Sequence, residues 1–424
     1  MNKKIIQSFY KYYFKSLYFF KDNAFFILFL FLLVIIRFQV SFLNYLNFKY
    51  DKYKNVNVKV VNQYIKHGKR GDYYVLKLKN NNLSFYTTSR ENLKHLLNEN
   101  VKLTIITSGV SFKGYLFTFY APSFNIKLMS VSFMDEYIEK QHENPEIANI
   151  FKALFLGESI DFKTRQELST LGISHLIALS GLHLGFISLF LYLFLTPVYK
   201  IFQRKFPYRN RYVDLAAVIF VIEFLYLYVT GFPPSLIRAY VLEIVVFLYA
   251  YYLQNPFSLK ILGVVFFVSL LIFGEKVFSI GYFLSITGVF YIYLFFRYYR
   301  PTLKNSVLLS FYMFAVMFII SHSFFGNFNV YQLFSPFVNL GFTIFYPVEI
   351  LLHAIGVGGV LDGLILKYLS LGGHFGMFKL PLWLGIGFLI VSIGAFFSKR
   401  LFYGINLLSL AVIIYVTGVS IVQI

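Results

Sequence analysis

Cysteine is absent from the 424 residues of the chain. Its absence excludes disulfide bonds, thiolate metal sites and a cysteine nucleophile. Charged residues are also scarce: they make up 14% of the sequence, whereas a soluble domain carries roughly 25%. So few charges cannot cover a water-facing surface, which argues against a soluble enzyme, a disordered protein and a coiled coil.

Several enzyme signatures are missing as well. The sequence has no Gly-x4-Gly-Lys-Ser/Thr loop for a nucleoside triphosphate and no His-Glu-x2-His zinc motif. Ser180 is followed by Gly181 but is not part of a Gly-x-Ser-x-Gly nucleophile elbow. His175 and His183 would ligate a metal only with a third ligand from elsewhere in the chain. We therefore expect a protein that is not an enzyme, with no catalytic residue, metal or cofactor.

Apolar residues dominate instead, because 58% of the chain is hydrophobic and 21% is aromatic. Each run of about 20 apolar residues can cross a bilayer as a helix. The expected fold class is a polytopic α-helical membrane protein with about 9–11 membrane segments and a small extracytoplasmic β domain. From residue 173 onward the predicted spans are about 173–198, 213–230, 234–253, 260–274, 278–296, 305–322, 336–354, 381–397 and 402–420.

Residues 1–48 are predicted to form a basic cytoplasmic N-terminus and a membrane anchor. Five lysines precede an apolar run from about Ala24 to Val40. No small-residue cleavage site follows this run, so it is not typical of a removed signal peptide. The positive charge in front of it predicts that the N-terminus lies in the cytoplasm.

Residues 49–130 change character and are predicted to form a β domain outside the membrane. Polar and apolar residues alternate there between turn residues, which is typical of strands. The predicted elements are strands around 56–60, 76–78 and 83–85, a helix over 91–98, and strands over 102–107 and 114–120. Three strands, a helix and two strands is the element order of an OB-fold, which often binds single-stranded nucleic acid. The alternative is some other small β domain.

Positive charge is in large excess, with 39 Lys and Arg against 19 Asp and Glu and a formal net charge of +20. Part of this charge lies in the β domain, which violates no topology rule because large domains are translocated largely regardless of charge. Lys66, Lys69 and Arg70 are candidates for binding a polyanion there. The alternative is an ordinary solvated strand surface.

Residues 131–424 are predicted to form the transmembrane domain, which begins with amphipathic helices over 131–172. Basic loops after about 198, 296 and 397 test its topology. The first two agree with a cytoplasmic N-terminus, whereas the third disagrees if 336–354 crosses the membrane fully. Two solutions stay open: a segment near 336–372 is re-entrant or interfacial, or an extra crossing lies in the glycine-rich stretch 356–373.

The stretch 172–183, Gly-Ile-Ser-His-Leu-Ile-Ala-Leu-Ser-Gly-Leu-His, is the most unusual in the chain. Polar side chains such as those of His175, Ser180 and His183 are costly at membrane depth unless they face a bundle interior or a water-filled path. A helix can break at Ser180-Gly181, and a broken helix presents free N–H groups that can hold a phosphate. The alternative is a close helix crossing in which the histidines form hydrogen bonds between helices.

A second stretch, 231–239, places Arg238 about one turn inside an apolar helix that Pro234 begins. An arginine near the bilayer centre costs roughly 2.5–3.5 kcal/mol on insertion scales. It therefore needs a carboxylate, helix C-terminal carbonyls or a phosphate as a partner, unless it snorkels to the interface. Glu223 and Glu243 are predicted at nearly the same depth of one hairpin, where they would share a proton or pair with Arg238.

These stretches resemble elements of the ComEC family of competence proteins. The stretch 172–183 is similar to the family signature, and Ala153–Glu158, Pro234–Ala239, Phe278–Ser285 and Ser335–Leu340 resemble further family elements in the same order. Many family members carry a C-terminal metallo-β-lactamase-like nuclease domain. This chain ends about four residues after its last apolar span and lacks a His-x-His-x-Asp-His cluster, so the nuclease role is not expected here.

The resemblance implies a channel that passes one DNA strand through the bacterial cytoplasmic (inner) membrane during natural transformation, with an OB-like domain outside. The residues expected to line or shape the path are His175, Ser180, Gly181, His183, Arg238 and Asn339, with Glu158, Glu223 and Glu243 as gating or charge partners. The expected partners are single-stranded DNA, membrane lipid, an extracytoplasmic DNA receptor, a cytoplasmic ATPase or single-strand-binding protein, and a second copy of the chain.

Two alternatives of other classes stay open. A proton-coupled transporter of a small anionic solute would use the carboxylates of Glu223 and Glu243. A scaffold would only dock the uptake machinery, and its function would not depend on Arg238 or His183. The transport of DNA itself distinguishes the channel from both alternatives.

Overall fold

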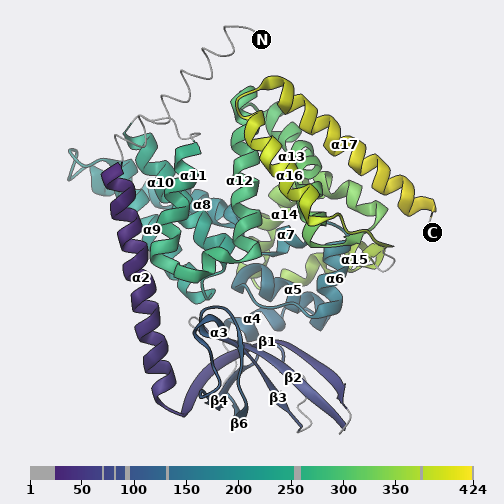
Figure 1. Cartoon of the computed structure of the whole chain (residues 1–424). Helices are drawn as coiled ribbons and strands as arrows, with labels where there is room; N and C mark the ends of the chain where they lie inside the picture. Colours follow the sequence, from purple (N-terminus) through teal and green to yellow (C-terminus); the bar gives the residue numbers. More distant parts are fainter. Residues whose placement is uncertain are drawn as a thin grey trace.

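The computed structural model describes residues 24–68, 71–80, 83–90, 96–129, 133–252, 259–372 and 376–422. A small β domain lies at one end of a larger assembly of helices, and the long helix α2 (Ala24–Tyr50) runs along one side toward it (Figure 1). This architecture confirms the predicted fold class of a polytopic helical membrane protein with a small β domain.

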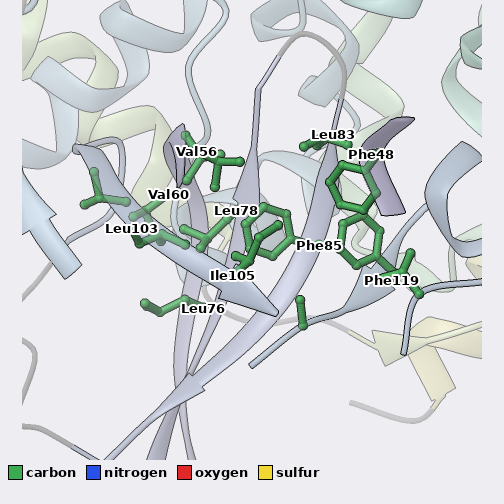
Figure 2. Packing of buried hydrophobic residues seen from close by; sticks show 14 of the residues in the cluster. Phe48, Val56, Val60, Leu76, Leu78, Leu83, Phe85, Leu103, Ile105 and Phe119 are labelled. Carbon is green, nitrogen blue, oxygen red and sulfur yellow. The ribbon is translucent and has the colours of Figure 1, made fainter. Parts of the chain in front are cut away.

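Helix α2 begins with the predicted apolar run and continues beyond Val40 to Tyr50. One face of its last turns, with Tyr45 and Phe48, is buried against the β domain. Phe48 is 3% exposed and belongs to the core of that domain, where Figure 2 shows it next to Phe119. The Tyr45 hydroxyl donates a hydrogen bond to the Val110 carbonyl, 3.0 Å away. Helix α2 therefore ties the membrane helices to the β domain.

Six strands form the sheet of the β domain, in the spatial order β5-β3-β2-β1-β4-β6. They are β1 (Tyr53–Gly68), β2 (Gly71–Lys79), β3 (Ser84–Ser89), β4 (Asn100–Ile106), β5 (Phe119–Tyr120) and β6 (Ser123–Leu128). The first half of β1 pairs with β4 and its second half pairs with β2. Alternate side chains point inward, so that Val60, Leu76, Leu78 and Phe85 are fully buried (Figure 2).

The two edges of this sheet are brought together by β5 and β6, because only Ala121 and Pro122 separate these strands. β5 runs parallel to β3, whereas β6 runs antiparallel to β4. The hydroxyls of Thr87 and Ser123 lie 2.7 Å apart across the junction, and the Ile106 N–H donates to the Pro122 carbonyl at 3.0 Å. The sheet therefore curls around its core, while its assignment to the OB class stays a prediction.

The strand predicted over 114–120 is wrong in its first half. Helix α3 (Phe112–Leu116) occupies that part, and only the two residues of β5 pair as a strand. The helix forms because the Ser111 hydroxyl caps it by accepting a hydrogen bond from the Gly114 N–H at 3.1 Å. Of the short helix predicted over 91–98, residues 91–95 lie outside the described residues, and 97–98 form a turn.

Three short helices link the β domain to the membrane helices, as predicted for 131–172. They are α4 (Phe133–Glu139), α5 (Pro145–Leu156) and α6 (Phe162–Thr170). α5 ends at Gly157, whose φ of 72° is a left-handed conformation that favours glycine. The apolar faces of α5 and α6 pack into one core with α14 (Ser335–Ala354). These helices thus form a platform between the sheet and the membrane helices (Figure 1).

Among the described residues, eight helices are long and apolar enough to cross a membrane. They are α2, α8 (Gly181–Gln203), α9 (Arg211–Val229), α10 (Pro234–Tyr251), α12 (Ile280–Tyr298), α13 (Leu303–Phe324), α14 with its preceding turn, and α17 (Lys399–Val422). Two shorter apolar helices, α11 (Leu259–Phe273) and α16 (Leu382–Ala395), add to them. The number of segments agrees with a multi-pass membrane protein.

The topology that the sequence left open is decided around α14. After α13, strand β7 (Asn327–Phe328) pairs with β8 (Gly376–Met377), which lies just before α16. The end of α13 and the start of α16 therefore lie at the same level. Between them, α14 begins beside Ser310, whose hydroxyl donates to the Pro336 carbonyl at 3.1 Å. Within α13, Ser310 lies about 21 Å from the end of the helix. The chain after β7 therefore runs back along α13 to the level of Ser310 and then returns through α14.

This re-entrant path determines which end of the helical assembly the third basic loop shares. Because 330–372 starts and returns at one level, α13 and α16 are successive crossings. The loop at 399–400 then lies on the same side as those at 200–211 and 297–304. All three basic loops are therefore compatible with the predicted cytoplasmic N-terminus under the positive-inside rule, and the extracytoplasmic placement of the β domain stays a prediction.

Candidate functional site

The break predicted at Ser180-Gly181 is present. A short helix, α7 (Ser174–Ile177), ends at Ala178, and α8 begins at Gly181 with Ser180 as its N-cap. The Ser180 hydroxyl accepts a hydrogen bond from the Leu182 N–H at 3.3 Å, and the His183 imidazole accepts one from the Ser180 N–H at 3.0 Å. These bonds form a capping box, which satisfies N–H groups that a helix start leaves free.

His183 is fully buried at a contact between helices. Its ring centroid lies 4.5 Å from that of Tyr346 and 5.8 Å from that of Phe342, and both of these residues belong to α14. Each aromatic ring meets the imidazole edge to face. This environment agrees with the alternative interpretation of a helix contact, and it means that His183 shapes the site without lining it.

His175 has the opposite environment. Its side chain is exposed, although the neighbouring Leu176 and Ile177 are buried in the core shared with α5, α6 and α14. It interacts with the side chain of Asn339 in α14, which in turn donates a hydrogen bond to the Ser310 hydroxyl at 3.3 Å. The broken end of α7 therefore meets the re-entrant start of α14 beside the His175 side chain.

Arg238 lies one turn inside α10 and is 6% exposed. Its Nε donates a hydrogen bond to the Ser285 hydroxyl of α12, 2.7 Å away. Within the described part of the chain, no carboxylate forms an ion pair with it, so the predicted pairing with Glu223 or Glu243 is wrong. A β-carbon built on Gly181 would lie 3.5 Å from its Nη2 atom, so the guanidinium lies beside the start of α8. Two positive groups, the arginine and the N-terminal end of a helix dipole, thus face one region.

Four of the five family-like stretches converge on this region. The Ser235 hydroxyl donates to the Leu179 carbonyl, so the start of α10 is bonded to the break between α7 and α8. Arg238 joins the break to Ser285 of the stretch Phe278–Ser285, and Asn339 of the stretch Ser335–Leu340 interacts with His175. Sequence spacing suggested each stretch separately, and only the folded chain shows that they form one site.

Glu223 and Glu243 form a separate pair nearby. Both carboxylates contact the Ser188 hydroxyl of α8, and its distance to Glu243 Oε1 is 2.7 Å. Ser188 also lies 3.0 Å from the Leu184 carbonyl. A hydroxyl has one hydrogen, so it cannot donate to three acceptors, and one carboxyl group must carry a proton to complete the network. The predicted equal depth of the two glutamates is confirmed, whereas the role of Ser188 was missed because nothing in the sequence pattern distinguishes it.

Glu158 lies apart from these residues, at the contact between the β domain and the helical platform. Its carboxylate pairs with the Lys59 ammonium of β1, and Asp135 of α4 lies 4.0 Å from the same ammonium. Next to this pair, Asn98 and Ser159 exchange two hydrogen bonds of 2.7 and 3.0 Å. Burial raises the pKa of Glu158 to about 7, and the Lys59 charge opposes this rise.

Reversing the charge at Lys59 should detach the β domain from the platform. Lys59→Glu places a third carboxylate beside Glu158 and Asp135, and breaking one side of such a pair costs about 3 kcal/mol. We expect faster proteolysis in the segments around the β domain of the purified chain. The double variant Lys59→Glu/Glu158→Lys should restore protection, whereas Lys127→Glu, on an exposed lysine of β6, should leave it unchanged. Equal proteolysis of Lys59→Glu and the parent chain would contradict the docking role.

The structure describes one of the three residues that are predicted to bind a polyanion. Lys66 is exposed near the end of β1. Lys69 and Arg70 lie outside the described residues. Nothing in the described part of the β domain pairs Lys66 with a carboxylate, so its charge is available to a ligand.

A row of side chains that the sequence did not single out crosses three neighbouring strands. Lys77 of β2 stands opposite Tyr86 of β3, and Tyr86 stands beside Tyr120 of β5. The Lys77 ammonium lies 5.5 Å from the centre of the Tyr86 ring, and Tyr120 is 54% exposed. The strand alternation predicts that each residue points outward, but only the pairing register shows that they are neighbours.

Comparison with known proteins gives one match. A family model described as a competence protein matches residues 154–419, which is more than half of the chain. No curated protein and no solved structure matches the chain. The matched range begins in α5 and contains every residue of the converging site around Arg238.

Proposed function

This chain belongs to the competence protein family, and from this membership we propose that it conducts single-stranded DNA across the cytoplasmic membrane of a bacterium during natural transformation. Membership in the family indicates a role in DNA uptake, and the membrane helices make the chain a multi-pass membrane protein. The channel role and the identity of the membrane go beyond these findings and form the proposal.

The observation that carries the proposal is the site around Arg238. A buried guanidinium is held by one neutral hydroxyl, with no carboxylate to neutralise it among the described residues. It lies beside the start of α8, where the positive end of the helix dipole favours an anion. Phosphate is the anion that recurs along a nucleic-acid strand, and arginine binds it with two parallel hydrogen bonds. Because no resident carboxylate pairs with this guanidinium among the described residues, its charge suits the phosphates of a passing DNA strand.

Two interrupted helices meeting inside the membrane support a transport path. The break between α7 and α8 faces the re-entrant start of α14, and the accessible His175 lies where they meet. Backbone that leaves the helical pattern at membrane depth is tolerated where it lines a cavity or is buried in protein, and transporters use such helix ends to hold polar cargo. We therefore place the DNA path between α8, α10 and α14.

For the β domain we propose an OB-like role in collecting the strand. The sheet order and the parallel pairing of β3 with β5 suit a curled barrel, and the row of Lys77, Tyr86 and Tyr120 combines charge with aromatic faces. Single-stranded DNA binds such rows because each base can stack on a ring while lysine neutralises the backbone.

Replacing Tyr86 and Tyr120 with alanine should weaken binding of a labelled oligothymidine to the full-length chain in detergent. Loss of base stacking costs about 1–3 kcal/mol per ring, so we expect the dissociation constant to rise at least 10-fold. Lys77→Ala should lower the salt dependence of binding. Tyr403→Ala, at a ring on α17, is the control, and unchanged binding by the double variant would remove this surface from the DNA path.

We propose further that the chain is not an enzyme and does not move DNA by its own hydrolysis of ATP. The sequence has no phosphate-binding loop of the P-loop type. The driving force must then come from a cytoplasmic ATPase, from strand-binding proteins or from an ion gradient. A DNA receptor on the side of the β domain would deliver the strand, and neither a metal nor a cofactor is needed for such a path.

The proposed function is tested by following fluorescent DNA in a strain that lacks this protein. We expect DNA to be bound at the cell surface and to stay outside the cytoplasm, and we expect the full chain, supplied in trans, to restore entry. Entry at the normal rate without the protein would reject the channel role.

A proton-coupled transporter of a small anion is the second candidate, because the Ser188 network must hold a proton between Glu223 and Glu243. This pair is also compatible with a channel whose movement uses a proton gradient. Glu223→Gln/Glu243→Gln separates the candidates. Loss of small-anion uptake in proteoliposomes with normal DNA entry in cells favours the transporter.

A further inference from the structure

A chain of four titratable side chains lies where α14 ends, away from the site around Arg238. It runs from Asp362, the first residue of α15 (Asp362–Leu369), through His142 and His353 to Glu349. His142 Nδ1 lies 2.9 and 3.1 Å from the two carboxylate oxygens of Asp362. His142 Nε2 lies 3.0 Å from His353 Nε2, and His353 Nδ1 lies 2.8 Å from the backbone carbonyl of Glu349.

The protons in this chain can be counted from the acceptors. A backbone carbonyl only accepts, so His353 Nδ1 carries a hydrogen, and an ionised Asp362 only accepts, so His142 Nδ1 carries one too. If both rings were neutral, two nitrogen lone pairs would face each other at 3.0 Å. One more proton between the Nε2 atoms turns this repulsive contact into a hydrogen bond. If Asp362 carries this proton instead, it donates to His142 Nδ1, and His142 Nε2 donates to His353 Nε2. The number of protons in the chain of side chains is then the same.

Packing holds the two rings in this arrangement. His142 stacks on Phe151 of α5 with ring centroids 4.7 Å apart and planes 8° from parallel. His353 lies 4.8 Å from Phe155. A β-carbon built on Gly358 would come within 2.6 Å of the His353 ring, so only glycine leaves room on that side. Neither imidazole can turn away without moving its neighbours.

Other charged groups at this corner are few. Glu349 is fully buried, and its carboxylate lies 3.3 Å from His353 Nδ1. The Tyr137 hydroxyl of α4 donates to the His353 carbonyl at 2.8 Å. Lys152 of α5 is paired with Glu139 of α4 at 2.8 Å. Among the described residues, Glu143 is a further acid at this corner, and it lines an open cleft.

The cleft gives protons access to the four-residue chain. It has a volume of about 600 Å³ and is lined by Gln141, Glu143, Asn144, Val357, Gly359 and Asp362, among others. Asp362 is 15% exposed at its side chain, whereas the side chain of His142 behind it is fully buried. A proton from solvent therefore reaches His142 through Asp362. Because α4 contacts Lys59 of the β domain, this entrance lies on the side of the β domain.

We propose that His142 and His353 form a binding site for one shared proton, and that a second proton separates them and releases the α4–α5 turn from α14. With two protons, both Nε2 atoms are donors and both rings are cations in contact, so the bond becomes a repulsion. α14 also carries Phe342 and Tyr346, which hold His183 at the helix break. Release at the C-terminal end of α14 should thus change the support that the middle of this helix gives to the break.

Burial of two rings in contact opposes a second positive charge on the pair. Burial lowers the pKa of His142 below that of a free histidine, and its contact with Asp362 opposes this shift. A histidine with a lowered pKa stabilises the folded state above about pH 6.5 and loses that contribution as the pH falls toward its folded-state value. The contact should therefore be closed near neutral pH and open in acid.

The proposal is tested by measuring the distance between spin labels across the contact at several pH values. The chain has no cysteine, so Lys140→Cys and Lys367→Cys, at exposed lysines near the end of α4 and on α15, give one labelled pair in the full-length protein. Between about pH 7.5 and pH 5, we expect the distance distribution to shift to longer values. His142→Gln and His353→Gln, tested separately, should each remove this shift, because glutamine does not titrate.

His67→Gln is the matched control, because His67 also contacts a carboxylate, that of Asp72, but lies on the exposed surface of the β domain. It should leave the shift intact. A distance that is independent of pH in the parent chain overturns the proposal, and so does a normal shift in both glutamine variants. Stoichiometric binding of Zn²⁺ that His142→Gln abolishes would identify the ligand as a metal ion and would also overturn it.

Discussion

Replacing Arg238 with alanine should reduce the entry of DNA into the cytoplasm roughly 10- to 100-fold, because a hydrogen bond to a charged group contributes about 1.5–3 kcal/mol. The chain should still insert and fold. A buried arginine without a carboxylate partner costs roughly 2.5–3.5 kcal/mol on insertion scales, and its removal relieves that cost. Counting transformants alongside the amount of protein in the membrane fraction measures both effects.

Two further variants separate charge from geometry at this position. Arg238→Lys keeps the charge but loses the planar group that bonds Ser285 and pairs with a phosphate, so we expect partial activity. Arg300→Ala removes an exposed arginine from a basic loop and should transform normally. Normal transformation by Arg238→Ala, at a normal protein level, would favour the scaffold over the channel.

Replacing Gly172 with valine should abolish transformation by displacing the re-entrant segment. Gly172 has a φ of 72°, and an ordinary residue in this left-handed conformation costs about 1–2 kcal/mol. A β-carbon there would lie 2.5 Å from Cγ of Gln332, which is buried in the turn before α14. Both effects push the signature stretch away from that turn. We expect a lower melting temperature of the purified chain and a loss of DNA entry.

The control for this variant is Gly185→Ala. Gly185 lies inside α8, and a β-carbon built on it meets no atom within 4 Å. Alanine stabilises a helix interior by about 1 kcal/mol relative to glycine, so stability should be unchanged or slightly higher. If Gly172→Val melts at the temperature of the parent chain and transforms normally, the contact between Gly172 and Gln332 contributes neither to stability nor to DNA entry.

Local signals in the sequence predicted the local features of this fold. The break at Ser180-Gly181 was predicted because a Ser-Gly pair can break a helix, and the structure contains the break, with Ser180 as the cap of α8. The start of α10 at Pro234 follows from the fixed φ of proline. The strand predicted over 114–120 failed because a single capping residue, Ser111, outweighs the alternation of aromatic side chains.

Contacts between distant parts of the chain could not be predicted from the sequence. Ser285 was visible in a family-like stretch, but nothing placed it against Arg238. Glu158 was grouped with the membrane carboxylates, whereas it pairs with Lys59 in another domain. The re-entrant course of 330–372 depends on the pairing of β7 with β8, which is two residues long and leaves no periodic pattern. Partners of this kind are decided by packing and not by spacing.

The most direct measurement is photocrosslinking of DNA during uptake. A photoreactive amino acid is placed at His175 or Asn339, where α7 meets α14, and for comparison at Leu193, an exposed apolar residue of α8. We predict crosslinks between entering single-stranded DNA and positions 175 and 339, and none at position 193. DNA that enters normally without a crosslink at either inner position would contradict a path through these helices.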